Sequence, residues 1–348
     1  MRKVKWGVIG AGGIADRRTL PGMMLSDNCE LVAVMEVNEE LSKKIAEKYG
    51  ARYYYTNVND LLNNKEIEAV YIASPVAFHK EQIIQAAKAG KHVLCEKPIA
   101  ISFDESLQAY NSCCDNNVLA SAGFMMRYHS LHRAIKQIIA EKKIGQIVSC
   151  RLQMSCWFPF IEGNWRQQLK NTGGGALMDL GIHCVDLAEY MLQDEIVGVT
   201  AFCGTKTFNY DIEDSANVML KTKSGTVIYI DNNYNIPDDA ASSRIEIFGT
   251  KGSIVAEGTV GQTDTGVLKC IYSNQQDYVA LQQRETAETE IIEASNENLY
   301  TKELESFSRS ILEGEDLEVP MQCAVRAQQI IESAYKSSQI EEVVKINY

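Results

Sequence analysis

Residues 4–15 read VKWGVIGAGGIA, an apolar run that passes directly into a turn of glycines. The motif is G-x-G-x-x-A, and its place after a strand and before a helix is typical of dinucleotide-binding folds. In this motif Gly10 permits a tight turn, Gly12 lets a pyrophosphate approach the main chain, and Ala15 lets the helix pack closely. The stretch therefore predicts a site for the phosphates of a dinucleotide at a helix N-terminus.

A carboxylate at the end of the second apolar run predicts the choice of dinucleotide. Glu36 follows the glycine turn at about the distance, roughly 20 residues, at which an acidic residue binds the adenosine ribose hydroxyls. Its charge would repel a 2′-phosphate, and the residues after it, Val37-Asn38-Glu39-Glu40, supply no cation. The sequence predicts NAD rather than NADP, unless Lys43 or a more distant cation reaches the site.

The first third of the chain alternates short apolar runs with helical segments. Asn38 and Gly50 bracket one predicted helix, Gly90 ends another, and Ser102 begins a third. Because parallel neighbours need crossover helices, this alternation predicts an α/β Rossmann fold, a doubly wound parallel sheet, in a domain over residues 1–122. The predicted strands are residues 4–10, 31–37, 52–55, 69–73, 92–95 and 119–124.

From residue 147 onward, single apolar residues alternate with polar ones. Val148, Cys150, Leu152, Met154 and Cys156 follow this pattern, which predicts a strand with one buried face. Two hairpins, turning at residues 224–225 and 249–252, and helices over 298–312 and 321–337 follow. We predict an α+β second domain, residues 123–348, with a large, mostly antiparallel open sheet, through which we expect a homo-oligomer, a dimer or tetramer, to form.

The composition excludes some classes of partner. A formal net charge of -12 leaves no basic surface for phosphate backbones or anionic lipid, which argues against nucleic acid and membrane partners. The first residues lack the apolar stretch of a signal peptide, so we expect a cytoplasmic protein. The ten cysteines contain no C-x-x-C pair and are expected to be reduced. No cluster of Cys or His accompanies His129 and His132, so we predict a surface pair and no metal site.

Two other segments carry residues suited to catalysis. Lys97 ends the apolar run KHVLCEKP at 91–98, and a strand end is unfavourable for an ammonium unless it faces a ligand crevice. In the segment GGGALMDLGIH at 173–183, Asp179 and His183 share one face of a predicted helix, which Asp186 continues. A carboxylate beside an imidazole suits a proton acceptor, although a solvated helix face explains this spacing equally well.

Four motifs taken together resemble the Gfo/Idh/MocA oxidoreductase family. They are GAGGIA at 10–15, ASP at 73–75 with His79, CEKP at 95–98, and GGGALMDLGIH at 173–183. The resemblance extends over nearly the whole chain, including the tail from Asn298 to Tyr335. It implies an NAD-dependent dehydrogenase that acts on CH–OH groups of a sugar, cyclitol or glycoside, with a Rossmann domain followed by an α/β domain with a large open sheet.

The resemblance also implies roles for individual residues. Catalytic positions are matched by Lys97, Asp179 and His183. Cofactor-binding positions are matched by Gly10, Gly12, Gly13, Ile14, Glu36, Val37, Ser74, Pro75, His79, Glu96, Lys97, Trp165 and Arg166. Substrate-binding positions are matched by Arg127, Tyr128, Trp165, Asp179 and His183. For Arg127, Tyr128, Trp165 and Arg166, packing or surface charge is an equal alternative.

Two departures from the family pattern affect this interpretation. Val76 stands where many relatives have Asn, so a polar contact there is absent or replaced. The segment 157–164 is strongly aromatic, and it could stack on a sugar ring or an aglycone or serve packing alone.

Three functions remain open from the sequence. The leading one is hydride transfer, in which His183 moves the hydroxyl proton, Asp179 orients it and Lys97 binds the oxygen. Lys97 is an alternative base. The second function is a hydrolase that oxidises a glycoside transiently with bound NAD. The third is a non-catalytic NAD-binding regulator, against which the presence of all three catalytic residues argues.

Overall fold

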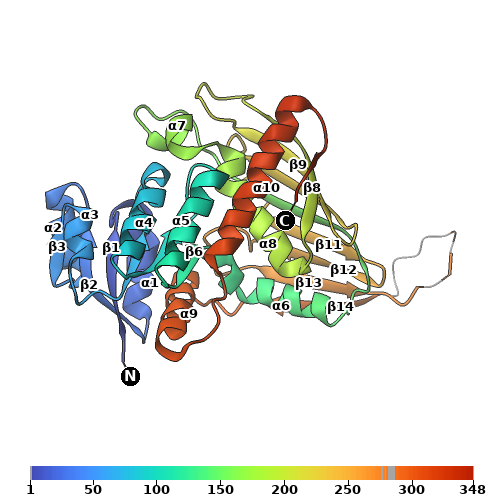
Figure 1. Ribbon diagram of the computed structural model, residues 1–348. Coiled ribbons are helices and arrows are strands. Elements are labelled where there is room, and N and C mark those ends of the chain that lie inside the picture. Colours follow the sequence, from blue (N-terminus) through green and yellow to red (C-terminus); the bar gives the residue numbers. More distant parts are fainter. Residues whose placement is uncertain (1, 276, 279, 281–286, 348) are drawn as a thin grey trace. The chain divides into compact units, whose positions relative to one another are not determined.

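The computed structural model describes residues 2–275, 277, 278, 280 and 287–347 (Figure 1). Its contacts divide the chain into two compact units. The first comprises Met1–Met125, Gly163–Gly174 and Asn298–Gln328. The second comprises Met126–Glu162, Gly175–Glu297 and Gln329–Tyr348. The sequence predicted consecutive domains, 1–122 and 123–348, whereas these units are interleaved, because a late helix packs on the first sheet.

A six-stranded parallel sheet with the order β3-β2-β1-β4-β5-β6 forms the centre of the first unit. This is the predicted doubly wound arrangement, and its inner strands are buried on both faces because helices flank the sheet. The strands are β1 (Val4–Ile9), β2 (Cys29–Met35), β3 (Tyr53–Tyr55), β4 (Ala69–Ile72), β5 (His92–Glu96) and β6 (Ala120–Gly123).

Helices α2 and α5 of the first unit are bounded by the residues that the sequence indicates. The side chain of Asn38 accepts from Leu41 N, Gly50 ends its helix with φ of 71°, and Ser102 accepts from Glu105 N. The helices are η1 (Ala15–Thr19), α1 (Leu20–Leu25), α2 (Glu39–Tyr49), α3 (Val58–Leu62), η2 (Val76–Phe78), α4 (His79–Lys88), α5 (Phe103–Asp115), η4 (Trp165–Gln167), α7 (Leu169–Thr172) and α9 (Leu299–Glu313).

Helix α9 returns from the far end of the chain to cover the parallel sheet. Leu304 and Phe307 are buried in the same apolar core as Trp6 of β1. The Trp6 and Phe307 rings lie 5.6 Å apart, and the Trp6 indole donates to Ser308 Oγ at 3.2 Å. The first unit is therefore completed by residues about 300 positions later, which no local sequence signal could show.

A nine-stranded sheet dominates the second unit, with the order β14-β13-β12-β11-β7-β10-β9-β8-β15. All its pairings are antiparallel except that of β7 with β10, so the predicted mostly antiparallel sheet is confirmed. Its strands are β7 (Ile147–Ser155), β8 (Ile196–Gly204), β9 (Ser215–Thr222), β10 (Val227–Asn233), β11 (Arg244–Gly249), β12 (Gly252–Glu257), β13 (Val267–Tyr272), β14 (Glu288–Glu293) and β15 (Val344–Lys345).

Helices pack on one face of this large sheet. Helix α8 packs against α6 and β7, and it is buried along almost its whole length. The other face carries exposed apolar side chains, among them Met219, Tyr229 and Ile291. The helical segments are η3 (Met125–Tyr128), α6 (Ser130–Ala140), η5 (Leu177–Gly181), α8 (Ile182–Leu192) and α10 (Met321–Ile340), which begins in the first unit.

Two expectations for the second domain were wrong in detail. His129 and His132 are fully buried, because their ring nitrogens find partners inside the fold. His132 contacts Met126 O at 2.8 Å and Thr259 Oγ1 at 3.1 Å, and His129 Nε2 contacts Thr265 O. Val148, predicted on the buried face of its strand, is 57% exposed.

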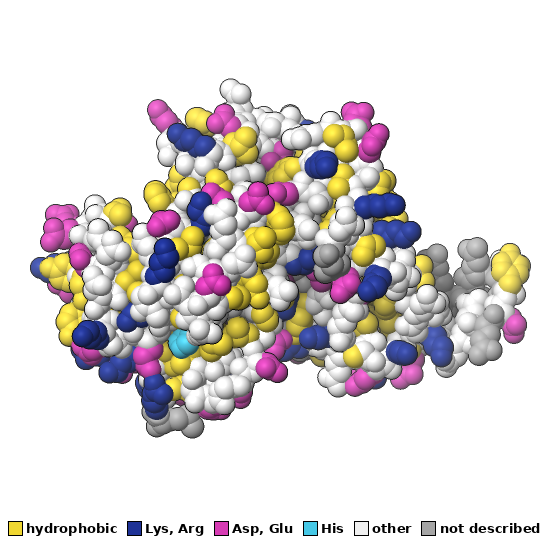
Figure 2. Space-filling model, in the orientation of Figure 1, with side chains coloured by type: hydrophobic (Ala, Val, Ile, Leu, Met, Phe, Trp, Pro, Cys, Tyr) yellow, Lys and Arg dark blue, Asp and Glu magenta, His cyan; other side chains and the backbone are white. Residues whose placement is uncertain are grey.

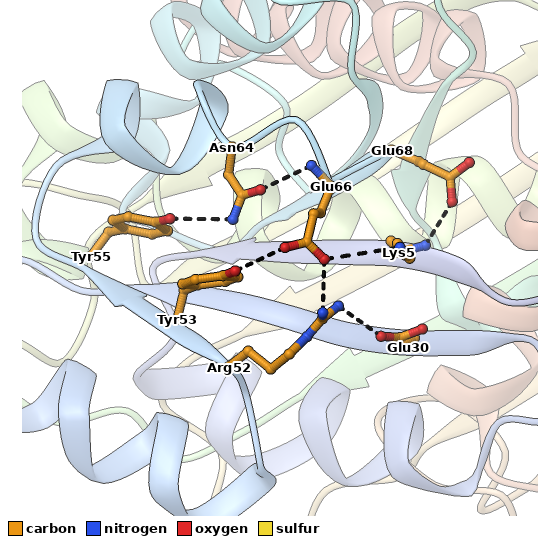
Figure 3. A network of polar contacts seen from close by, with 8 residues as sticks. All are labelled: Lys5, Glu30, Arg52, Tyr53, Tyr55, Asn64, Glu66 and Glu68. Atoms are coloured by element: carbon orange, nitrogen blue, oxygen red, sulfur yellow. Dashed lines mark hydrogen bonds and ion pairs between the residues drawn. The ribbon is translucent and has the colours of Figure 1, made fainter.

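A network of ion pairs occupies the amino ends of the first strands, the edge of the parallel sheet away from the predicted site (Figure 3). Arg52 bridges Glu30 and Glu66 at 2.9 and 2.8 Å. Tyr53 donates to Glu66 at 2.8 Å, and Lys5 lies 3.9 Å from the same carboxylate. These opposite charges compensate one another at the amino ends of the strands.

The surface carries charges of both signs. Acidic and basic side chains are interspersed on the face shown in Figure 2. The ten cysteines are free, and six of them are buried. Within the ranges that the structure describes, no helix has the length and apolar character that crossing a membrane requires.

Candidate active site

The glycine turn after β1 has the backbone that the motif predicts. Gly10 and Gly13 have φ of 74° and 56°. A Cβ on Gly10 would lie 2.5 Å from Ser74 N, so the turn packs directly on the loop after β4. Apart from the neighbouring residues of the chain, no described atom lies within 4 Å of a Cβ position on Gly13, and Ile14 leads into η1. The open backbone before a helix start fits the pyrophosphate of a dinucleotide.

Glu36 lies directly beside this turn. Its Oε2 accepts from Gly12 N at 3.2 Å and its Oε1 accepts from Val37 N at 2.9 Å. The Val37 side chain is 77% exposed. The carboxylate that was predicted to bind a ribose is therefore held at the carboxyl end of β2, beside the glycine turn.

His79 joins the loop after β4 to the loop after β5. It is buried, and its Nε2 lies 2.6 Å from Ser74 O while its Nδ1 lies 2.7 Å from Pro98 O. Carbonyl oxygens only accept, so both contacts are hydrogen bonds only when both ring nitrogens carry protons. Burial lowers the pKa of His79, and the two carbonyls act against that change. The Ser74 hydroxyl donates to Gln82 in turn.

Glu96, the last residue of β5, lies in a buried acidic cluster next to Lys97. Its carboxylate accepts from the Tyr71 hydroxyl. Burial raises the pKa of Glu96, whereas Tyr71, Lys97 and Arg166 lower it. Glu303 of α9 is 1% exposed, and neither of its carboxyl oxygens has a hydrogen-bond partner among the described residues. Burial and the charge of Glu96 raise the pKa of Glu303 well above its usual value.

Trp165 and Arg166 belong to a short segment that packs with the first unit. The Arg166 guanidinium lies over the Trp165 ring, 5.5 Å from its centroid. Because Arg166 also lowers the pKa of Glu96, its charge acts at the end of β5. The first unit thus contains all the residues that were predicted to bind the cofactor, from the glycine turn, the ends of β2, β4 and β5, and the segment with Trp165 and Arg166.

The second unit contains the two predicted catalytic residues Asp179 and His183. Asp179 lies in η5, a π-helical turn, and His183 follows in the first turn of α8, 3% exposed. Asp179 Oδ2 accepts from the hydroxyl of Tyr234, just after β10, at 2.8 Å. The Tyr234 ring contacts Phe158 edge to face at 5.0 Å, so part of the aromatic segment packs behind this carboxylate.

Asp186 and Arg127 form a separate buried ion pair. Arg127 Nε and Nη2 donate to the two oxygens of Asp186 at 2.9 and 2.6 Å, and the guanidinium lies over the Tyr190 ring. Tyr128 is buried beneath the Arg133 guanidinium. The Asp186 carboxylate is therefore paired with Arg127, although the spacing placed Asp186 on the same helix face as Asp179. A contact of Arg127 or Tyr128 with substrate stays a prediction.

Three polar residues of the site had no assigned role at the level of sequence. Tyr71 and Tyr234 lie among apolar residues of strands or just after them, where a tyrosine also suits packing alone. Glu303 carried a detectable signal, because it interrupts the apolar stripe of α9 with Tyr300, Leu304 and Phe307 at helical spacing.

The glycine turn and its carboxylate on a doubly wound sheet, together with a second unit that carries an Asp and His pair, define a dinucleotide-dependent oxidoreductase. Residues 4–124 match the family model described as "Oxidoreductase family, NAD-binding Rossmann fold", and residues 132–255 match the GFO/IDH/MocA C-terminal domain. The chain belongs to the GFO/IDH/MocA family of NAD(P)-dependent oxidoreductases.

Curated relatives and known structures agree with this assignment. Myo-inositol 2-dehydrogenase of Thermotoga maritima is 30% identical over 74% of this chain and 78% of its own length. The 1,5-anhydro-D-fructose reductase of Ensifer adhaerens is 27% identical over 76% of this chain and 79% of its own length. Aldose-aldose oxidoreductase of Caulobacter crescentus shares the fold with a TM-score of 0.89, at 22% identity over 99% of this chain and 100% of that chain.

Proposed function

We propose that this protein transfers a hydride between a carbinol carbon of a sugar, cyclitol or glycoside and NAD. The observation that carries the proposal is the buried His183 imidazole one helical turn after Asp179, whose carboxylate accepts from Tyr234. Relatives named for 1,5-anhydro-D-fructose, glucose 6-phosphate and myo-inositol support a polyhydroxylated substrate.

Each catalytic residue has a separate role in this proposal. His183 accepts the proton of the reacting hydroxyl, and Asp179 orients the hydroxyl and favours the charged imidazolium. Lys97 donates a hydrogen bond to the same oxygen and stabilises the negative charge that develops on it. Arg127, Tyr128 and Trp165 are assigned to the remainder of the substrate.

The residues assigned to the cofactor all belong to the first unit. When bound, NAD supplies the nicotinamide carbon that accepts or returns the hydride. The backbone of the glycine turn would hold the pyrophosphate, and Glu36 with Val37 would bind the adenosine ribose. The nicotinamide side would be bound by Ser74, Pro75, His79, Glu96, Trp165 and Arg166.

Absorbance of NADH over a panel of aldoses, inositols and aryl glycosides tests the activity. On a substrate found this way, Lys97→Met and His183→Ala should each lower kcat by about 10²-fold or more, whereas Lys88→Met, at the exposed end of α4, should not. The mechanism is wrong if both active-site variants keep wild-type turnover. Release of an aryl leaving group without net NADH would identify the hydrolase instead.

The selectivity for NAD over NADP rests on Glu36. A charged hydrogen bond contributes about 2 kcal/mol, so Glu36→Ala should raise the KM for NAD by roughly 30-fold. The same change removes the charge that repels a 2′-phosphate, so the KM for NADP should fall. Glu39→Gln, in the exposed first turn of α2, is the control and should change neither constant. An unchanged ratio of the two constants in Glu36→Ala would overturn the assignment.

The exposed face of the large sheet supports a homo-oligomer, and the sequence leads us to infer a cytoplasmic protein. The strand register places Met219, Tyr229, Arg151 and Glu246 in one row across four strands. Through Val255 and Lys269 the row continues to Ile291, which is 65% exposed. Light scattering should give a dimer or tetramer, and Tyr229→Glu should shift the mass toward the monomer. A monomeric wild type would contradict this assignment.

A further inference from the structure

A carboxylate outside the predicted site holds the start of the helix that carries Asp179 and His183. Glu213 lies in the loop that leads into β9. Its Oε2 accepts from Gly175 N at 2.8 Å, and its Oε1 accepts from Leu177 N at 2.9 Å. The hydroxyl of Tyr335, on α10, donates to the same Oε1 at 2.7 Å. Three donors from two parts of the chain thus meet at one carboxylate.

The main chain of Glu213 contacts the same helix start. Ala176 N donates to Glu213 O at 3.1 Å. A Cβ on Gly175 would lie 2.1 Å from that carbonyl oxygen, so only glycine allows the approach. The run of glycines before the helix is therefore explained at position 175 by contact with Glu213. Asp179 N in turn donates to Gly175 O at 2.9 Å, which links the held segment to the predicted catalytic carboxylate.

The charges around Glu213 favour this arrangement. Burial raises the pKa of Glu213, and the hydrogen bonds from Tyr335, Leu177 and Gly175 act against that change. A negative charge at a helix N-terminus is stabilised by the helix dipole. Burial and the nearby Glu213 raise the pKa of Tyr335 well above its usual value, so this hydroxyl keeps its proton and remains a donor.

We propose that Glu213 and Tyr335 are positioning residues for the hydride-transfer reaction, because together they fix the start of the helix on which Asp179 and His183 lie. This inference rests on the proposed function. Neither residue touches the reacting atoms in this proposal. Their effect passes through the helix, where a displacement of about 1 Å at the reacting groups can lower a rate by roughly 100-fold.

The test uses Glu213→Gln and Tyr335→Phe in the full-length protein. Glutamine keeps the size of the side chain, but its NH2 group cannot accept from a backbone N–H, so one contact, to Gly175 or to Leu177, is lost. We expect kcat to fall by about 10- to 100-fold in Glu213→Gln and less in Tyr335→Phe, while the KM for NAD stays unchanged. Amide hydrogen exchange over residues 175–183 should become faster in both variants.

The matched control is Glu189→Gln, at the other end of the same helix. The Glu189 carboxylate accepts from Ile196 N at 2.8 Å through one oxygen, which the carbonyl oxygen of glutamine can replace, so this change removes a charge from the same helix and leaves the helix start intact. We expect it to leave kcat unchanged. Tyr335→Phe removes one hydroxyl and keeps the carboxylate, so it reports on the contact even if Glu213→Gln does not fold.

The outcomes separate the two hypotheses. If Glu213→Gln and Tyr335→Phe keep wild-type kcat and wild-type exchange while His183→Ala is inactive, the positioning role is wrong and the proposed function stands. If His183→Ala keeps its activity, the proposed function is wrong. A loss of kcat in Glu189→Gln as large as in Glu213→Gln would also overturn the positioning role, because the effect would then reflect general stability.

Discussion

Glu303 is a carboxylic acid that the fold buries without a hydrogen-bond partner among the described residues. Its pKa is raised well above 4.5 by burial and by Glu96. An acid with a raised folded-state pKa binds more protons in the folded than in the unfolded protein, so its folded state loses stability as the pH rises above 4.5. This loss continues until the pH reaches the folded-state pKa.

The Glu303→Gln variant should therefore be more stable than wild type, and the difference should grow from pH 5 to pH 7, above the pH of 4.5 at which the loss of stability begins. Glutamine resembles the protonated acid in size and cannot ionise. Thermal unfolding at the two pH values measures the effect. Glu313→Gln, at the exposed end of the same helix, should show no such growth. A difference in Tm that is equal at both pH values would contradict the assigned protonation state.

Single residues were predictable where a backbone requirement limits the choice of side chain. The positive φ of Gly10 and the cap at Asn38 follow from local rules and were predicted. The burial of His129 and His132 was not, because their partners Thr265 and Thr259 lie more than 100 residues away. Tyr234 and Glu213 likewise act through contacts that exist only after the second sheet has formed.

At the scale of elements, His79 connects the loops that follow β4 and β5. Its two carbonyl contacts hold Ser74 and Pro98, and Pro98 follows Lys97. His79→Ala removes both contacts, of which the neutral imidazole makes one as a hydrogen bond that contributes about 1 kcal/mol. We expect the Kd for NADH to rise by about 5-fold, because the loops of the nicotinamide side lose their connection. Fluorescence titration with NADH measures this constant.

His92→Ala is the matched control for that prediction. His92 lies at the opposite end of β5, where its Nδ1 accepts from Leu119 N at 3.0 Å. This change also removes a hydrogen bond between neighbouring strands, so it should lower Tm. The Kd for NADH should stay at the wild-type value. Equal effects of the two substitutions on the Kd would assign both histidines to stability alone.

The periodicity of apolar residues predicted most helices and strands. The order of the strands in a sheet could be predicted only where the connections between strands allow few arrangements. Parallel neighbouring strands need crossover helices to connect them. The first sheet could therefore be derived from the alternation of strands and helices. The second sheet could not be ordered in this way, because β7 pairs in parallel with β10, about 80 residues later. The π-helical turns η1 and η5 also have no simple sequence signal, since an α-helix uses the same residues.

At the scale of the whole molecule, the first sheet depends on the helix near the end of the chain. Phe307 of α9 is 2% exposed and packs on Trp6. Truncation of a buried phenylalanine costs about 3–5 kcal/mol, so Phe307→Ala should lower the urea midpoint and weaken NADH binding together. Phe202→Ala, at a residue 72% exposed on β8, should change neither quantity. If Phe307→Ala binds NADH as tightly as wild type at a temperature at which the variant is folded, α9 contributes to stability alone.

The return of α9 to the first sheet also sets the order of events during synthesis. The parallel strands leave the ribosome first, but the residues that cover Trp6 follow about 200 residues later, roughly 10–40 s at ordinary translation rates. During that interval the nascent sheet exposes an apolar face that the finished protein buries. The nascent chain therefore offers a binding surface for chaperones throughout this interval, and the NAD-binding unit, although its sheet is encoded first, is not complete until residues 298–328 have been made.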